Sequence, residues 1–496
     1  MHRPEHAVVI AGGGPTGLTL AGELALAGVE VVVIERRQSH ELVGARAGGL
    51  QARSIEMFDQ RGIAERFLQE GQKAQTTGFA GVRFDISGFP TRHPYGLGLW
   101  QTHIERILTG WVEELGVPIH RGIDVSGLSQ DDGGVEVALS DGGTMRARYL
   151  VGCDGGRSVV RKAAGIAFPG TAPTTSNLIA EVEMTAMPEF GVHRSPLGIH
   201  SFGRRDYSIV DGKIVYADYG PIGVMVTEQN AETASEPTLD DLRQALIAAC
   251  GTDYGVHRPL WISRFTDAAR QAATYRRGRV LVAGDAAHIH PPDGGQGLNT
   301  GVQDAMNLGW KLAQVVKGVS PDALLDSYHD ERHPVAAQVL RLTLASVTMR
   351  ADDDRSRAVR ETMAELLAME EPRRTMAATM SGLAIRYEMG GVHPLVGRRM
   401  PDLELATAEG PRRVYELLHD ARPLLISLGT VVDGGAWAGR VRAVAAAYDG
   451  PWELPAIGEV DAPGAVLVRP DGYVAWVGEG SDSGLVETME RWFGPA

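Results

Sequence analysis

Cysteine is scarce in this chain, which has only Cys153 and Cys250 among 496 residues. Two distant cysteines cannot form a disulfide framework or a thiolate metal cluster, so we expect a reducing, cytoplasmic location. Long apolar runs are missing too, because Glu23 interrupts the longest candidate before the roughly 18 residues of a membrane span are reached. Basic residues are outnumbered, and the formal net charge of −14 disfavours nucleic acid or an anionic membrane as a partner.

Residues 6–35 have the pattern of a βαβ unit that binds a dinucleotide. Residues 6–11 are an apolar run typical of a buried parallel strand, and a glycine turn over 12–17 follows directly. Residues 18–27 have a helical composition, and a second apolar run covers 29–34. Glu35 follows that run 23 positions after the first glycine, near the roughly 20 positions that the dinucleotide pattern requires.

Each glycine of the turn has a physical reason. Gly12 permits the tight turn, Gly14 lets a pyrophosphate approach the backbone, and Gly17 lets helix and strand pack closely. The following helix offers unpaired N–H groups and a positive dipole end to phosphates. Glu35 can accept hydrogen bonds from ribose hydroxyls and would repel a 2′-phosphate. The sequence therefore predicts the ADP half of FAD or NAD, rather than NADP, at this turn.

Three further residues occupy places where a dinucleotide could be contacted. Arg46 lies in a glycine-rich loop, where it either touches the phosphates or the redox ring or is a solvated loop arginine. Gln101 lies near the start of a helix predicted over 97–116. Asp154 follows a buried strand over 149–153, and so is expected at the carboxyl edge of a parallel sheet, where ligands bind.

Asp285 ends another buried strand and precedes a second glycine-rich loop. The loop runs over 289–299 and leads into a long helix predicted over 300–316, so it forms an anion-stabilising site at a helix N-terminus. Asp285 could hydrogen-bond a sugar or ribityl hydroxyl. His288 and His290 lack a nearby cysteine and an obvious third ligand, so we expect them to pack and hydrogen-bond in the loop rather than bind a metal.

The remaining segments predict a second domain and a separate tail. Within 177–261, the stretches 178–184, 207–210, 214–219 and 222–226 alternate between apolar and polar positions, as in a half-buried antiparallel sheet, and a helix is predicted over 238–249. The arginines of this segment either face a ligand or lie on a solvated edge: Arg194, Arg204 and Arg205. Helices are predicted over 324–344, with Pro334 breaking or kinking the first, over 358–380, and over 436–447. The tail has no cysteine and cannot perform disulfide chemistry.

Taken together, these motifs resemble the FAD-dependent aromatic hydroxylases of the para-hydroxybenzoate hydroxylase class, the group A flavoprotein monooxygenases. The likeness is closest to the branch of aromatic polyketide hydroxylases and rifampicin monooxygenase. It covers nearly the whole chain. It is carried by the turn over 12–17 with Glu35, the Arg46 loop, Gln101, Asp154-Gly155, Gly284-Asp285 with 291–299, the 328–334 stretch and the cysteine-free tail.

The resemblance implies an α/β fold built from three domains. A Rossmann-like FAD-binding domain with a helical extension is expected over 1–175 and 266–390. A substrate-binding domain made of an antiparallel sheet is inserted over 176–265, where the sheet would form a lid over the substrate. A thioredoxin-like domain without cysteines covers 391–496. No oligomeric state is predicted.

The resemblance also implies a set of site residues. No catalytic base and no metal are assigned, and Arg46, Pro292 and Gly295 are expected beside the flavin ring. Asp154 belongs to a motif that serves FAD and NADPH together. The implied cofactor-binding residues are Gly12, Gly14, Pro15, Thr16, Gly17, Glu35, Arg36, Arg46, Gln101, Asp154, Asp285, Gly295, Gly297, Leu298 and Asn299.

The implied reaction is hydroxylation of a polycyclic aromatic or polyketide-type substrate, in biosynthesis or antibiotic inactivation. NADPH, with NADH as the alternative, reduces FAD, and dioxygen then forms a C4a-hydroperoxyflavin that transfers oxygen to the substrate. Baeyer–Villiger-type or ring-opening oxygen insertion by the same flavin is an open alternative. So is a non-catalytic flavoprotein that sequesters a drug. A nicotinamide dehydrogenase would leave Asp285 and its loop without a role.

Overall fold

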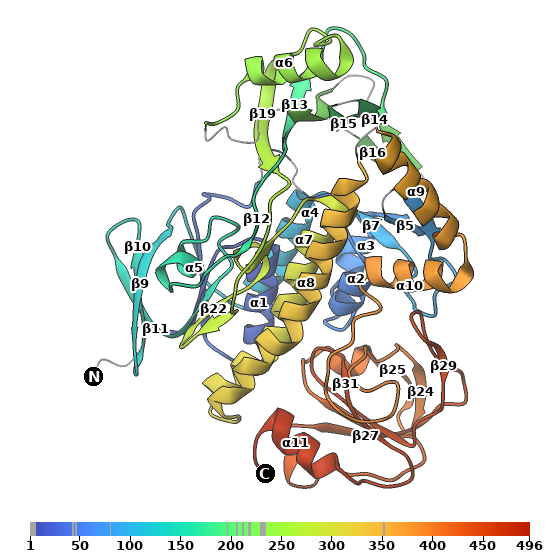
Figure 1. The fold of residues 1–496 in the computed structure, drawn as a ribbon. Coiled ribbons are helices and arrows are strands. Elements are labelled where there is room, and N and C mark those ends of the chain that lie inside the picture. Colours follow the sequence, from blue (N-terminus) through green and yellow to red (C-terminus); the bar gives the residue numbers. More distant parts are fainter. Residues whose placement is uncertain are drawn as a thin grey trace.

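The computed structural model describes residues 6–41, 44, 47–79, 81–195, 197–204, 207–210, 213–216, 220–228, 235–350 and 353–496. Three parts of the chain are visible in Figure 1. An antiparallel sheet with one helix lies at the top of the view, a larger α/β domain lies in the middle, and the C-terminal domain lies below. The predicted α/β class with an inserted sheet and a C-terminal domain is confirmed.

A mostly parallel sheet forms the centre of the largest domain. Its strand order is β21-β22-β11-β1-β2-β8, in which β22, β11, β1, β2 and β8 pair in parallel and β21 pairs antiparallel to β22. The antiparallel strands β9 and β10 extend it from β11. The bounds are β1 His6–Ala11, β2 Val31–Glu35, β8 Ile119–Arg121, β9 Val125–Asp131, β10 Gly134–Leu139, β11 Thr144–Gly152, β21 Arg276–Arg277 and β22 Val280–Val282.

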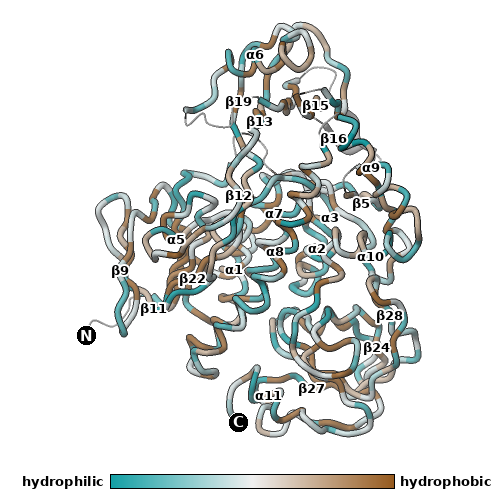
Figure 2. Tube along the Cα trace, in the orientation of Figure 1, coloured by the Kyte–Doolittle hydropathy of each residue, from teal (hydrophilic) through white to brown (hydrophobic). Residues whose placement is uncertain are grey.

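Apolar side chains on both faces explain why this sheet is central. Val8, Val9 and Ile10 of β1 have no solvent exposure, and Figure 2 shows hydrophobic residues concentrated near β11 and β22. Helix α1 packs against both α4 and α7, and α7 packs against α8. The helices of this domain are α1 Pro15–Leu26, α2 Ala52–Asp59, α3 Ala64–Leu68, α4 Gln101–Glu114, α5 Val159–Ala163, α7 Gln296–Val316 and α8 Asp326–Thr348.

The inserted domain is a five-stranded antiparallel sheet in the order β14-β15-β18-β13-β19. Leu178, Val224 and Val226 are buried on one face together with Leu242 and Leu246 of α6. Thr238 caps α6 through a capping box with Asp241. The bounds are β13 Ser176–Glu183, β14 Gly191–Ser195, β15 Gly198–Arg204, β16 Tyr207–Val210, β17 Lys213–Tyr216, β18 Ile222–Glu228, β19 His257–Thr266 and α6 Leu239–Cys250.

The C-terminal domain contains a six-stranded mixed sheet in the order β25-β24-β27-β26-β30-β31. One face of its helix α11 buries Met489, Trp492 and Phe493. The bounds are β24 Glu404–Thr407, β25 Gly410–Arg413, β26 Leu424–Ser427, β27 Arg442–Ala447, β28 Trp452–Leu454, β29 Gly458–Val460, β30 Ala465–Val468, β31 Val474–Gly478 and α11 Leu485–Phe493.

Short elements complete the framework around the site. Strands β3, β7 and β4 form a small antiparallel sheet, and β5 and β6 form a hairpin that packs against α10. Among the described residues, no helix is long and apolar enough to span a membrane. The bounds are β3 Gly49–Leu50, β4 Gln72–Ala74, β5 Thr76–Phe79, β6 Val82–Asp85, β7 Gly96–Gly98, β12 Gly170–Thr171, β20 Ala269–Gln271, β23 His288–Ile289, α9 Asp354–Leu367 and α10 Glu370–Met380.

One predicted element is wrong, and one predicted helix is present without the break that its proline suggested. The predicted helix over 436–447 is strand β27 from Arg442 onward, because pairing in parallel with β26 outweighs the helical preference of its alanines. Pro334 does not end its helix, since α8 continues from Asp326 to Thr348 with Pro334 inside. Pro334 is exposed there, so water can bond the carbonyl that lacks an N–H partner.

Candidate functional site

A cavity of about 1310 Å³ extends along the carboxyl ends of the parallel strands. It begins at the turn after β1, passes the strand ends of β2 and β11 and Asp285, and continues past the start of α7 to the β5–β6 hairpin. This edge of an open α/β sheet is where ligands bind. No described residue from 176–265 lines the cavity, so the expected role of the inserted sheet as a substrate lid stays a prediction.

The three glycines of the first turn differ in what surrounds them. Gly12 has a φ of +105°, and a Cβ there would lie 2.3 Å from the carbonyl oxygen of Cys153. A Cβ on Gly17 would lie 2.0 Å from the carbonyl oxygen of Gly12. Gly14, the N-cap of α1, has nothing within 4 Å of its Cβ position. The turn thus needs two glycines for its own backbone, while Gly14 leaves open space on the cavity side.

Glu35 closes the turn from the end of β2. Its Oε2 accepts a hydrogen bond of 2.6 Å from the N–H of Gly13, and its Oε1 accepts one of 2.9 Å from Nε of Arg37. Burial raises the pKa of the Glu35 carboxyl, but Arg37 and the Gly13 N–H outweigh burial and leave that pKa below its usual value. Glu35 is therefore an anion held at the end of the cavity beside the first glycine turn.

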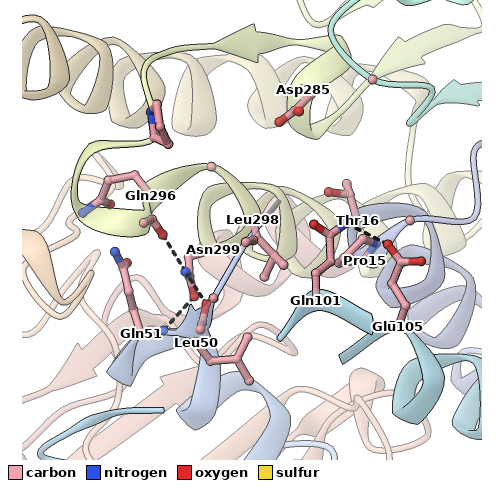
Figure 3. Close-up of a pocket in the computed structure, with 18 of the residues that line it drawn as sticks. Pro15, Thr16, Leu50, Gln51, Gln101, Glu105, Asp285, Gln296, Leu298 and Asn299 are labelled. Carbon is pink, nitrogen blue, oxygen red and sulfur yellow. Dashed lines mark hydrogen bonds between the residues drawn. The ribbon is translucent and has the colours of Figure 1, made fainter. Parts of the chain in front are cut away.

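Arg37 joins this acid to a second one on α4. Its Nη1 donates a 2.8 Å hydrogen bond to Glu105, and Nε2 of Gln101 donates another of 2.8 Å to the same carboxylate. Burial raises the pKa of Glu105, with Arg37 and Gln101 acting against it. Figure 3 shows Gln101 beside Glu105. Gln101 therefore lines the cavity, with its side-chain amide oriented by Glu105. Its expected contact with the flavin stays a prediction.

Asp154 supports the turn after β11. Its Oδ2 accepts hydrogen bonds from the N–H groups of Val159 at 2.7 Å and Val160 at 3.1 Å, at the start of α5. Its Oδ1 is buried and has no partner among the described residues. Asp154 also lines the cavity. One of its oxygens therefore organises the backbone, while the other is an acceptor without a partner among the described residues.

Asp285 and the first turn of α7 form the middle of the cavity. The Asp285 side chain is exposed and has no hydrogen-bond partner among the described residues. Its Oδ1 lies 3.9 Å from the Cβ position of Gly297, near the start of α7 (Figure 3). Gly295 is the left-handed N-cap of α7 with a φ of +61°, and Gly297 and Leu298 line the wall. The first N–H groups of α7 have no partners within the helix, so they face this space with the positive dipole end.

Asn299 fixes that helix turn to the opposite wall. Its amide nitrogen donates to the carbonyl oxygens of Gly295 at 2.8 Å and Gly49 at 3.3 Å, and its Oδ1 accepts from the N–H of Gln51 at 2.8 Å. Nε2 of Gln51 in turn donates to the carbonyl oxygen of Gly294 at 3.2 Å. These bonds hold the glycine loop against β3 and α2.

The two histidines of the loop bond to protein groups, in agreement with the prediction. Nε2 of His288 lies 2.7 Å from Oδ2 of the buried Asp304, whose Oδ1 accepts from Arg332 at 2.8 Å. Nδ1 of His290 lies 2.7 Å from the carbonyl oxygen of Pro291. Among the described residues, no group of three His, Cys, Asp or Glu side chains is arranged to hold a metal ion.

The other predicted residues fall into different places. Arg36 is exposed and lines the cavity. Pro15, Thr16 and Pro292 also line it. Arg46 and Arg205 lie outside the described residues. Arg194 extends toward the β5–β6 turn, where its Nη2 lies 3.5 Å from the Cβ position of Gly81. Arg204 stacks over Phe190.

Sequence reasoning missed several residues that line or organise the cavity. Arg37, Gln51 and Glu105 carry the hydrogen bonds described above, and Thr76 and Arg83 come from the β5–β6 hairpin. The only signal for Arg37 was its position directly after the strand-end acid. The others depend on contacts between distant segments.

FAD fits this arrangement of residues. Gly14 leaves room for a pyrophosphate at the N-terminus of α1. Asp285 and Oδ1 of Asp154 are acceptors without partners among the described residues, and hydroxyl groups of a bound molecule can satisfy them. The N-terminus of α7 offers N–H donors and a positive dipole to an electron-accepting ring.

Comparisons with known proteins agree with this geometry. Residues 5–343 match the FAD binding domain family, and residues 393–496 match the family described as aromatic-ring hydroxylase, C-terminal. The chain is 44% identical to rifampicin monooxygenase of Streptomyces venezuelae, over 99% of both chains. It is 38% identical to dialkyldecalin synthase of Streptomyces rugosporus, also over 99% of both.

A solved structure extends the likeness to three dimensions. The anhydrotetracycline hydroxylase from Streptomyces rimosus superposes with a TM-score of 0.88 at 42% identity, covering 99% of each chain. The resemblance inferred from the motifs is thereby confirmed. The chain belongs to the FAD-binding family of aromatic-ring hydroxylases, which are flavin-dependent monooxygenases, and its cofactor is FAD.

Proposed function

We propose that this protein uses FAD and NAD(P)H to hydroxylate a polycyclic aromatic or polyketide-type substrate, in antibiotic biosynthesis or antibiotic inactivation. The observation that carries the proposal is the single cavity that joins a dinucleotide turn to a separate space at the β5–β6 hairpin. One end suits the ADP half of FAD, and the far end leaves room for a second molecule. Two of the relatives reported above are named for acting on rifampicin and on anhydrotetracycline.

In this proposal the chain binds FAD, orients the substrate and shields the reaction from water. Bound FAD, once reduced, supplies the activated oxygen. The N-terminus of α7 stabilises negative charge on the reduced ring beside Gly295, Gly297 and Leu298. Asp285 holds the ribityl chain, and Glu35 and Arg37 organise the adenosine end. No side chain is assigned as a catalytic base, because the main task of the protein is to position the substrate and exclude water.

The test begins with the visible spectrum of the purified protein. NADPH and oxygen consumption are then followed with rifampicin, anhydrotetracycline and a panel of aromatic polyketides. We expect a flavin spectrum and consumption that one class of substrate stimulates. The mass and NMR spectra of the product, formed under ¹⁸O₂, separate hydroxylation from Baeyer–Villiger-type or ring-opening insertion. A protein that takes up no flavin on reconstitution contradicts the proposal.

A second candidate is a flavoprotein that binds an aromatic molecule without using NADPH. The likeness to dialkyldecalin synthase favours keeping it, since that relative is not named as a monooxygenase. This candidate predicts bound FAD and tight binding of a compound from the panel, with no stimulation of NADPH consumption by any compound that binds.

A further inference from the structure

The far end of the cavity is formed by the β5–β6 hairpin. This part, here called the distal compartment, adjoins the Gly294–Gln296 segment, because β5 packs against the short helical turn Asp293–Gly295. Its other wall includes Ser381, which follows α10. The hairpin residues that line it are Thr76, Thr77, Gly78, Arg83 and Ile86.

The hairpin is held in place by apolar packing on one of its faces. Phe79, Phe84 and Ile86 are buried in a cluster with Leu367 of α9 and Met380 of α10. The position of the distal compartment wall therefore depends on a fixed core rather than on a free loop.

Arg83 belongs to the other face of the hairpin. It pairs with Gly78 across the two strands, while its neighbour Phe84 pairs with Thr77. Because successive residues of a strand point to opposite faces, Arg83 shares its face with Thr76, Gly78 and Asp85. Gly78 has no side chain, so nothing on the partner strand covers the arginine at that position.

Arg83 is a cation without a partner in the part of the chain that the structure describes. It is exposed, lines the cavity, and forms no hydrogen bond or ion pair with any described residue. The acid on the same face of the hairpin, Asp85, accepts a hydrogen bond of 2.8 Å from the N–H of Ser87 instead. Asp293 of the adjoining loop is paired with Arg350. In a chain with a net charge of −14, a free guanidinium in a cavity marks a place for an anion.

We propose that Arg83 binds an anionic oxygen of the aromatic substrate, a phenolate, enolate or carboxylate, in the distal compartment. The inference rests on the proposed function for the presence of an aromatic substrate there, and adds which side chain selects it and by what charge. A guanidinium presents paired N–H donors that match such oxygens and stacks on aromatic faces. The hydroxyl of Thr76 supplies a further donor on the same face. The substrate class is therefore acidic polycyclic aromatics, rather than neutral ones.

The test measures binding to the FAD-loaded protein without NADPH. The probes are 2-hydroxy-1,4-naphthoquinone, which is an anion at neutral pH, and its neutral 2-methoxy ether, titrated by changes in flavin absorbance. We expect Arg83→Gln to weaken binding of the anion ~10- to 100-fold, the equivalent of one charge-assisted hydrogen bond. Binding of the ether should change less than ~2-fold, and Arg83→Lys should keep part of the preference.

Arg341→Gln is the matched control, because Arg341 is also exposed but lies on α8 away from the cavity. Equal anion affinity in Arg83→Gln and the parent protein overturns the proposal. So does an equal loss in Arg341→Gln, or a parent protein that binds neither probe or prefers the ether. A failure of the proposed function shows itself separately, as absent NADPH consumption in a protein that still selects the anion.

Discussion

The N–H of Gly13 donates a 2.6 Å hydrogen bond to Oε2 of Glu35, across 22 positions of the chain. The acid at the end of β2 therefore has two tasks. It holds the glycine turn in shape, and it presents a carboxylate to the end of the cavity where we propose that the adenosine of FAD binds. From sequence only the second task was expected. The hydrogen bonds from Gly13 and Arg37 together keep this carboxylate ionised and fixed in place.

Glu35→Gln should weaken FAD binding by ~10- to 100-fold. The amide cannot accept from both the Gly13 N–H and Arg37, and a charge-assisted hydrogen bond contributes about 1.5–3 kcal/mol. The measurement is titration of the flavin-stripped protein with FAD by fluorescence quenching. Glu30→Gln is the control. Glu30 is an exposed acid just before the same strand, and its side chain pairs with His6. An unchanged FAD affinity in Glu35→Gln contradicts this account.

Alanine at Gly14 and at Gly17 should separate cofactor binding from folding. A methyl group at Gly17 meets the Gly12 carbonyl oxygen at 2.0 Å, so Gly17→Ala should cost about 3 kcal/mol of unfolding free energy. Gly14 has open space, so Gly14→Ala should change that free energy by less than about 0.5 kcal/mol. It should nevertheless lower FAD affinity at least ~10-fold, because the methyl occupies the path of the pyrophosphate.

Urea unfolding of the flavin-stripped variants and FAD titration together check this contrast. A Gly14→Ala protein that binds FAD normally would show that the pyrophosphate lies elsewhere. A Gly17→Ala protein as stable as the parent would show that helix and strand can move apart.

The parts of the site that the sequence predicted are those set by local backbone. Gly12, Gly17 and Asp285 follow buried strands within a few residues, so the turn chemistry and the strand end place them together. Arg37 and Glu105 meet across 68 positions, and Arg83 reaches the cavity through a hairpin whose place depends on α10. No local pattern indicates such contacts. The prediction of a helix at β27 is wrong for the same reason. Its pairing with β26 involves a distant segment, and the residues of β27 alone do not indicate it.

Asp285→Ala should yield a protein that purifies largely without flavin. Asp285 has no partner among the described residues, so its removal leaves the protein intact while the ligand loses a charge-assisted hydrogen bond of about 1.5–3 kcal/mol. The ratio of flavin to protein absorbance measures the occupancy. Asp330→Ala, an exposed acid on α8, should retain full occupancy. Full occupancy in Asp285→Ala would remove the ribityl role from this residue.

A buried cluster of charges fastens the C-terminal domain to the FAD-binding domain. Glu331 of α8 accepts hydrogen bonds from Arg469 at 2.6 and 2.9 Å and from Lys311 of α7 at 2.9 Å. Arg469 also lies over the Trp492 ring of α11, at 4.6 Å. These side chains have little or no exposure, so each charge depends on its partners for compensation.

Glu331→Gln should therefore lower the unfolding free energy by about 3–5 kcal/mol at pH 7, because it leaves Arg469 and Lys311 partly uncompensated. Burial raises the pKa of Glu331, but Arg469 and Lys311 outweigh it and lower that pKa to about 2. The folded value is below the unfolded one, so this stability is present above about pH 4.5 and is lost as the pH falls toward 2. Urea unfolding at pH 7 and pH 3.5 should show the variant and the parent converging in acid. Glu409→Gln, an exposed acid beside Arg412, should follow the parent at both pH values. A difference between Glu331→Gln and the parent that is as large at pH 3.5 as at pH 7 would mean that the carboxylate charge is not what holds the two domains together.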